Sequence, residues 1–159
     1  MNTRRTHPLA LFCLGLAFAA CRAGGTTPDS LADFPKTTVT LSNEAGTHLI
    51  DAWLADSPAH RSQGLMFVRT LPPDSGMLFV YGESQYISMW MKNTYVSLDM
   101  LFVGDDGRIG NIVENAKPLS LDTIDSGGKA IAVLELPAGT AKRLGLRTGD
   151  RVHSPAIRL

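Results

Sequence analysis

The chain has 159 residues, which is enough for one domain together with a targeting segment. Its hydrophobic fraction of 44% is ordinary for a globular protein and allows a packed core. Lysine plus arginine equals aspartate plus glutamate at 15 each, so no basic surface is indicated and nucleic acid is not an expected partner.

The first 20 residues have the features of a secretory signal peptide. Arg4 and Arg5 form a basic start, residues 8–20 are apolar and small, and two alanines precede Cys21. A basic start followed by a short apolar run and small residues before a cleavage site is typical of an exported protein. The apolar run is shorter than the ~20 residues that a helix needs to cross a bilayer, so it does not predict a membrane span.

The position of Cys21 adds a prediction about anchoring. Small residues directly before a cysteine resemble a bacterial lipoprotein signal, which implies cleavage before Cys21 and a lipid on its sulfur. Phe18 departs from that pattern, where leucine is usual, and the alternative is a plain signal peptide with a free cysteine nearby. Arg22 is not the aspartate associated with inner-membrane retention. We therefore predict a lipoprotein held at the outer membrane, facing the periplasm, with the membrane as a partner through the lipid of Cys21.

Removal of the signal peptide also settles the cysteine chemistry. Cys13 is lost with residues 1–20, so the mature chain retains Cys21 alone and has no intramolecular disulfide and no cysteine nucleophile. Residues 21–36 contain Gly24-Gly25 and two prolines with little apolar content, which predicts a flexible tether. Residues 37–159 then form a single β-rich domain.

The domain begins with a predicted hairpin and a short helix. Residues 37–41 and 48–54 read as two strands, with turn residues at 43–46 between them. Ser57 followed by proline predicts the start of a helix, and Gly64 predicts its end.

The rest of the domain is predicted to consist mainly of strands, over 76–81, 86–92, 98–103, 108–114 and 129–136 and from 151. Turns are predicted at 82–85 and at Asp105-Asp106-Gly107, a polar loop at 118–128, and a short turn or helix at 137–143. About eight strands without repeats or strand–helix alternation indicate a mainly β fold, a small β-sandwich or barrel with one or two short peripheral helices.

Motifs spread along the domain carry a family resemblance. They are Arg61, Gly64-Leu65-Met66, Arg69, Gly76-Met77-Leu78-Phe79, Trp90-Met91-Lys92-Asn93-Thr94, Leu98-Asp99, Phe102, Gly107, Glu135, Gly139, Gly145 and Gly149-Asp150. With them, residues 38–153 resemble the bacterial and archaeal domain of unknown function 192 family. Ser97 departs from the family pattern, which often has proline there. The resemblance implies a compact, largely β domain that is often secreted, and it implies no accepted activity.

The stretch from Ser88 to Thr94 is the predicted site. Strand alternation puts Ser88, Trp90 and Lys92 on one face and Met89 and Met91 on the other. An indole, an ammonium, an amide and a hydroxyl close together suit a small ligand. The candidate ligand-binding residues are Arg61, Trp90, Lys92, Asn93, Thr94, Asp99 and Glu135.

Several functions fit these residues. The first is a membrane-tethered binding or accessory module for an unknown small molecule or protein partner. The second is an enzyme in which Asp99, Glu135 and Lys92 perform acid–base chemistry, although no serine, metal or phosphate-loop motif is present and no cofactor is predicted. A structural alternative also stands, in which Lys92 pairs with Asp99 or Glu135 and Trp90 belongs to the core.

Copper binding is a further alternative. All five methionines of the mature chain fall within 35 residues, and thioethers favour Cu(I). Met89 and Met91 lie two apart on a predicted strand and can point the same way. Methionine also fills irregular cores, and the histidines have no ligand spacing.

Overall fold

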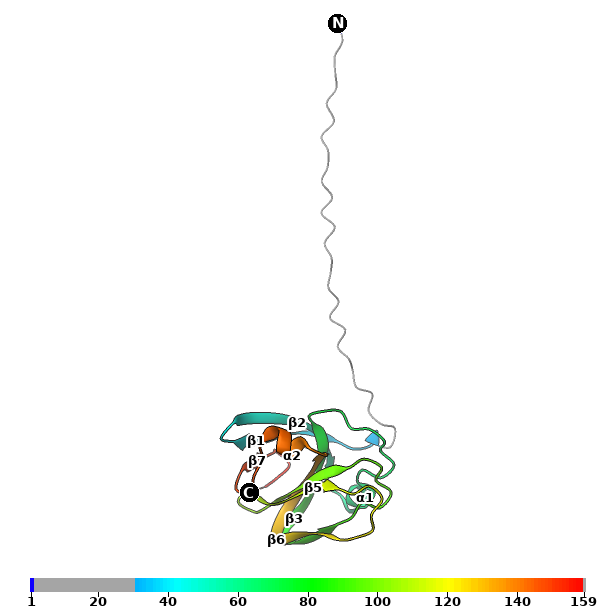
Figure 1. The fold of residues 1–159 in the computed structure, drawn as a ribbon, viewed down its shortest axis with the longest axis vertical. Helices are drawn as coiled ribbons and strands as arrows, with labels where there is room; N and C mark the ends of the chain where they lie inside the picture. The colour runs from blue at the N-terminus through cyan, green and yellow to red at the C-terminus, as the bar shows by residue number, and fades with distance from the viewer. Residues whose placement is uncertain (2–30, 159) are drawn as a thin grey trace.

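The computed structural model describes residue 1 and residues 31–158, so the predicted signal peptide and Cys21 lie outside the described residues. The described chain forms seven strands and two short helices (Figure 1). In chain order they are β1 Lys36–Asn43, β2 Gly46–Ala55, α1 Pro58–Gln63, β3 Ser75–Met89, β4 Leu98–Val103, β5 Ile109–Ala116, β6 Ile124–Pro137, α2 Thr140–Leu144 and β7 Arg151–His153. None of the helices described in residues 31–158 is long and apolar enough to cross a membrane.

The seven strands form one curled sheet in the order β5-β4-β6-β3-β2-β1-β7. Neighbours are antiparallel except β2 and β3, which are parallel and are connected through α1. The two edges of the sheet meet at one corner, where the amide of Ile109 donates to the carbonyl of Asp150 at 2.9 Å and Arg108 bridges to Arg151. The sheet is therefore a half-barrel, and the prediction of a mainly β fold with one or two short helices is confirmed.

Each face of the sheet carries its own apolar core, because alternate residues of a strand point to opposite faces. On β4, Met100 and Phe102 pack on the face that α1 and the N-terminal turn cover. Leu101 and Val103 pack on the opposite face, under α2. Both cores use long and branched side chains that are almost fully buried. The domain is thus held together by packing on both sides of one sheet.

Turn and cap residues define the first hairpin and α1 as predicted. Asn43 closes the β1–β2 turn, since its side-chain oxygen accepts hydrogen bonds from the amides of Ala45 and Gly46. The Ser57 hydroxyl accepts from the His60 amide at the start of α1. Gly64 ends the helix with φ of 50°, a backbone conformation that favours glycine.

The predicted strands 76–81 and 86–92 are one strand, which is a correction. β3 continues through the predicted turn at 82–85 and ends at Met89. Its pairing with β6 shifts register between Val80 and Gln85 and again between Tyr86 and Ser88, so the turn residues form an irregularity within the strand. β6 likewise begins at Ile124, inside the predicted polar loop. The two long strands β3 and β6 pair with each other and remain strands through polar stretches of the sequence. The described chain therefore has seven strands where the sequence indicated about eight.

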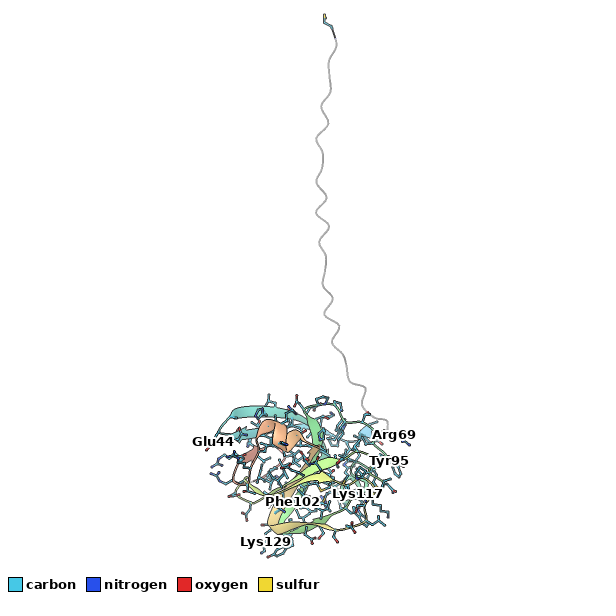
Figure 2. All side chains as sticks on the ribbon, in the orientation of Figure 1. Glu44, Arg69, Tyr95, Phe102, Lys117 and Lys129 are labelled. Carbon is cyan, nitrogen blue, oxygen red and sulfur yellow. The ribbon has the colours of Figure 1, made fainter. Side chains whose placement is uncertain are left out.

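The loops that contain Phe67, Thr94 and Leu119 gather at one end of the molecule, near residue 31, where the described domain begins. The amide of Phe67 donates to the carbonyl of Asn93 at 2.8 Å, and the amide of Leu119 donates to the carbonyl of Thr94 at 3.1 Å. Figure 2 shows Tyr95 at this end with Arg69, whose guanidinium lies 4.7 Å from the centre of the tyrosine ring. These contacts fix the loop that follows β3, which carries most of the predicted site.

Candidate functional site

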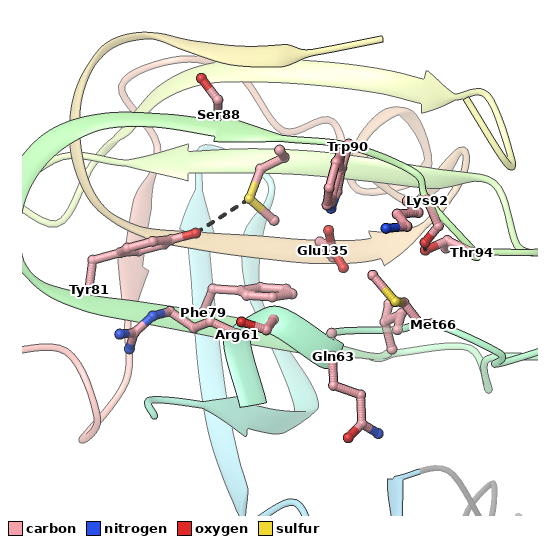
Figure 3. A pocket seen from close by; sticks show the side chains of 14 residues that line it. Arg61, Gln63, Met66, Phe79, Tyr81, Ser88, Trp90, Lys92, Thr94 and Glu135 are labelled. Atoms are coloured by element: carbon pink, nitrogen blue, oxygen red, sulfur yellow. Dashed lines mark hydrogen bonds between the residues drawn. The ribbon is translucent and has the colours of Figure 1, made fainter. Parts of the chain in front are cut away.

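A cavity of about 100 Å³ opens between the end of α1, strands β3 and β6, and the loop that follows β3 (Figure 3). Its lining consists of residues 61–66 together with Phe79, Tyr81, Ser88, Met89, Trp90, Lys92, Thr94 and Glu135. Residues far apart in sequence thus share one cavity, because β3 pairs with β6 and α1 leads the chain back beside β3.

Glu135 is the acidic residue among those that line the cavity. Its backbone pairs with Met77 of β3 and Met100 of β4, both fully buried, so apolar neighbours flank the carboxyl. Glu135 itself is 3% exposed, and within residues 31–158 its carboxyl has no hydrogen bond and no ion pair. Burial raises the pKa of Glu135 from 4.5 to about 8, because the ionised form loses its hydration. The carboxyl is therefore mainly protonated at neutral pH.

Aromatic rings and thioethers form the walls around Glu135. The Tyr81 hydroxyl donates to the sulfur of Met89 at 3.5 Å, drawn as the dashed line in Figure 3. Burial raises the pKa of Tyr81, the nearby Glu135 adds to the rise, and Arg61 opposes it. The ring of Phe79 lies against Gly64, where an added Cβ would stand 3.2 Å from the ring. Aromatic rings and thioethers thus form part of the wall, beside polar side chains such as Ser62 and Thr94, and Glu135 is the acid of the lining.

Arg61 lines the cavity but is already engaged by the backbone. Its Nη1 donates to the carbonyl of Asp56 at 2.6 Å and to the carbonyl of Val80 at 2.8 Å. Its guanidinium lies 5.2 Å from the centre of the Tyr81 ring, and Figure 3 shows it beneath that ring and directed away from Glu135. Arg61 therefore fastens α1 to β3 and holds Tyr81 in place.

Trp90 and Lys92 form the rim. Trp90 is 51% exposed, and the ammonium of Lys92 lies 5.1 Å from the centre of its ring. Lys92 forms no ion pair with any residue in the described part of the chain. The Thr94 hydroxyl donates to the carbonyl of Lys92 at 3.3 Å and shapes the turn. The cavity thus opens to solvent past an indole and a free ammonium.

The comparisons with known proteins agree with this fold. The family model DUF192, the domain of unknown function 192, described as "Uncharacterized ACR", matches residues 39–154. The chain belongs to the DUF192 family. No curated protein matches it at a significant level.

Two solved structures are similar to this DUF192 chain. A protein from Sinorhizobium meliloti 1021 described as a "putative transcription regulator" is 50% identical, with a TM-score of 0.74 over 76% of this chain and 95% of that chain. A protein of unknown function from Novosphingobium aromaticivorans DSM 12444 is 35% identical, with a TM-score of 0.73 over 82% of this chain and 99% of that chain. Nearly the whole length of each of these two chains aligns with this domain.

Five of the seven candidate ligand-binding residues line the cavity of the DUF192 domain, namely Arg61, Trp90, Lys92, Thr94 and Glu135. Asn93 does not line it. Its backbone adopts φ of 55°, its carbonyl accepts from the Phe67 amide, and its side-chain amide donates to the Met66 sulfur at 3.8 Å. Asn93 therefore shapes the loop that presents its neighbours.

Asp99 lies on the opposite face of the sheet, away from the cavity. It pairs with Leu136, so its side chain points to the face that Glu135 does not share. Its two carboxylate oxygens accept hydrogen bonds from the amides of Asn115 and Ala141, each at 2.9 Å. Asp99 is thus a buried anchor for the start of α2, and the acid–base group of Asp99, Glu135 and Lys92 is not brought together.

The methionines divide in a way that the sequence did not indicate. Met89 lines the cavity, whereas Met91 is fully buried in the core and is not among the lining residues. Met66 lines the cavity in its place, from the loop after α1. Within residues 31–158, no three histidine, cysteine, aspartate or glutamate side chains are grouped to hold a metal ion.

Phe79 and Tyr81 also line the cavity, although strand alternation did not indicate them as site residues. Both belong to a stretch whose composition indicates only a buried strand. The Gly64-Leu65-Met66 and Gly76-Met77-Leu78-Phe79 motifs were the available signal, since they belong to the family resemblance and lie on the segments that form the cavity wall.

Proposed function

We propose that the protein is an exported lipoprotein whose DUF192 domain binds a ligand in the Glu135 cavity. In this proposal a lipid on Cys21 anchors the chain in the outer membrane and the domain faces the periplasm. The anchoring is supported by Arg4 and Arg5, the short apolar run after them, and the small residues before Cys21. The tether predicted over residues 21–36 is corrected to residues 21–30, because Leu31 and Phe34 pack in the core and Lys36 begins β1.

The observation that carries ligand binding is the buried carboxyl of Glu135 without a partner. A buried polar group that lacks a hydrogen bond destabilises a fold by about 1–3 kcal/mol. A leucine at this position would fit the apolar neighbours Met77 and Met100 without that cost. An acidic group with a raised pKa that lines an open cavity without a protein partner is typical of a binding or reaction site, because a ligand can supply that partner.

A binding role needs only the groups that the cavity contains. Trp90 provides a flat contact at the mouth, and Glu135 provides a directional partner inside. Asp99 lies on the other face of the sheet, so the acid–base set of Asp99, Glu135 and Lys92 predicted for an enzyme is incomplete here. We therefore favour binding over catalysis.

Native mass spectrometry tests the binding function. The full chain, with a C-terminal affinity tag, is purified gently from whichever cell fraction contains it. We expect a bound small molecule that is lost in Trp90→Ala and retained in the control Tyr86→Ala, since Tyr86 is an exposed aromatic residue that does not line the cavity. A bare mass for the unaltered protein, before and after incubation with a metabolite extract, would contradict the proposal.

The same measurement includes copper as a rival ligand. Cu(I) added without oxygen is expected to leave the mass unchanged. A stoichiometric adduct that disappears in Met89→Ala or Met66→Ala would instead support a thioether copper site and replace the proposed function.

Membrane fractionation tests the anchor. We expect the unaltered protein to sediment with outer-membrane vesicles and Cys21→Ala to be released into the soluble periplasmic fraction. If Cys21→Ala still sediments with membranes, lipid anchoring at this residue is wrong. Mass spectrometry of the purified protein provides the control, because the lipid adds a defined mass to a chain that begins at Cys21.

A further inference from the structure

We propose that the group bound in the Glu135 cavity is an organic ammonium ion, held against the Glu135 carboxylate and between the rings of Phe79, Tyr81 and Trp90. This inference rests on the proposed ligand-binding function and names the chemical class of the ligand. Its support comes from the electronic character of the lining, the size of the cavity and the positions of the two nearby cations.

The acid, the thioethers and the aromatic rings of the lining present negative or electron-rich surfaces, beside the polar side chains of Ser62, Gln63, Ser88 and Thr94. Glu135 is an acceptor when ionised, and the thioether sulfurs of Met66 and Met89 are weak acceptors. The faces of Phe79 and Tyr81 attract cations through their quadrupoles. An ammonium ion is the complement of this set, whereas an anion would meet π faces and a carboxyl that must remain protonated.

The volume and the mouth define how much of the ligand enters. A cavity of about 100 Å³ has room for ordered water or for a small polar group. That space admits the charged end of an alkylamine. Because Trp90 is exposed at the rim, the remainder of the ligand leaves the cavity along the indole.

The two neighbouring cations leave the interior to the ligand. Arg61 is directed to the carbonyls of Asp56 and Val80 and away from Glu135 (Figure 3). Lys92 stays at the rim, where its ammonium lies over the Trp90 ring. The lysine shows that this indole face accepts an ammonium group, and its charge repels an incoming cation. Lys92 therefore weakens the binding of a cation and would strengthen the binding of an anion.

The protonation state of Glu135 determines whether the affinity for a ligand rises or falls with pH. A cation binds the ionised carboxylate, and the pKa of about 8 means that roughly a tenth of the free protein is ionised at pH 7. The affinity for an alkylammonium should then rise about tenfold from pH 7 to pH 9, since alkylamines themselves stay protonated to about pH 10. The affinity of a neutral ligand that accepts a hydrogen bond from the protonated carboxyl would fall from pH 7 to pH 9.

Calorimetric titration of the purified full chain, freed of any co-purified ligand, tests the inference in phosphate and borate buffers from pH 6.5 to 9. The probes are n-butylammonium and tetramethylammonium, with 1-butanol and butyrate as matched neutral and anionic controls. We expect binding of at least one ammonium probe, with an affinity that rises with pH, and no binding of the controls.

Three variants assign the effect to the cavity. Glu135→Gln keeps the shape and removes the charge, so it should weaken ammonium binding at least tenfold at pH 9. Lys92→Gln removes the repelling charge and should tighten ammonium binding several-fold. Glu114→Gln changes an exposed carboxylate on β5 that does not line the cavity and should leave binding unchanged.

The outcomes separate this inference from the function on which it rests. Tighter binding of butyrate or butanol, a falling affinity with pH, or retained ammonium binding in Glu135→Gln would overturn the ammonium class. If no probe binds while native mass spectrometry finds a ligand that Trp90→Ala loses, the class is wrong and the binding function stands. If neither experiment finds a ligand, both fail.

Discussion

Glu135 should make the stability of the folded domain depend strongly on pH. The carboxyl has an ordinary pKa of 4.5 and a pKa of about 8 in the folded chain, because burial removes its hydration and no partner among the described residues replaces it. Below pH 4.5 the group is protonated in both the folded and the unfolded states. Between pH 4.5 and about 8 the unfolded chain releases the proton and the folded chain keeps it, so the free energy of unfolding falls as the pH rises.

The size of this effect follows from the two pKa values. Each unit of pH across that window lowers the free energy of unfolding by 1.36 kcal/mol, so the whole window of 3.5 units corresponds to about 5 kcal/mol. Above pH 8 both states are ionised and this contribution becomes constant. Glu135→Gln removes the titrating group and keeps a similar shape. The free energy of unfolding of this variant should therefore not fall across this pH window.

Urea unfolding of the unaltered protein and Glu135→Gln at several pH values between 4.5 and 9 measures the difference. We expect the two proteins to agree within about 1 kcal/mol at pH 4.5 and the variant to be more stable by several kcal/mol at pH 8. Glu114→Gln, at an exposed position, should follow the unaltered protein throughout. Buffers without amines are required, since a bound ammonium would stabilise the folded state. Parallel pH profiles for Glu135→Gln and the unaltered protein would refute the unpartnered, buried carboxyl.

Other variants test the frame around the cavity. Asp99→Asn should lower the free energy of unfolding by about 3 kcal/mol, because one of two backbone amides loses its charged acceptor, and an unchanged urea midpoint would contradict the anchor to α2. Gly76→Ala should cost about 3 kcal/mol or more, since its Cβ would lie within 2.3 Å of the Glu135 carbonyl oxygen, and a fully stable variant would be inconsistent with this close approach of β3 and β6. Ser57→Ala should cost about 1 kcal/mol and Ser57→Gly only a few tenths, as for a helix N-cap, and equal losses in thermal unfolding would argue against the cap.

Local patterns predicted much of this fold. Ser57 before a proline, with Gly64 at the end, marked α1 because caps depend on residues within one turn. Period-two alternation separated Met89 and Met91 from Ser88, Trp90 and Lys92, and in the structure the first two are buried and the other three are exposed. These features depend on neighbours in sequence, so a single chain is sufficient to find them.

The predictions that failed depended on pairing partners. The stretch 82–85 has the composition of a turn, yet β3 passes through it because β6 is long enough to pair on both sides. Asp99 and Glu135 each stand near one end of an apolar strand and look equally suited to a site. The register that pairs Asp99 with Leu136 puts their side chains on opposite faces.

The sequence by itself determined the mainly β character, the family resemblance and five of the residues that line the cavity. The tertiary structure alone decided that Glu135 has no partner within residues 31–158, that Arg61 is held by backbone carbonyls, and that Met66 joins the wall. The physical reason is that burial and hydrogen bonding of a side chain depend on segments that meet only when the sheet curls. A raised pKa, and with it the chemistry proposed for the cavity, therefore arises from the fold and not from any local pattern.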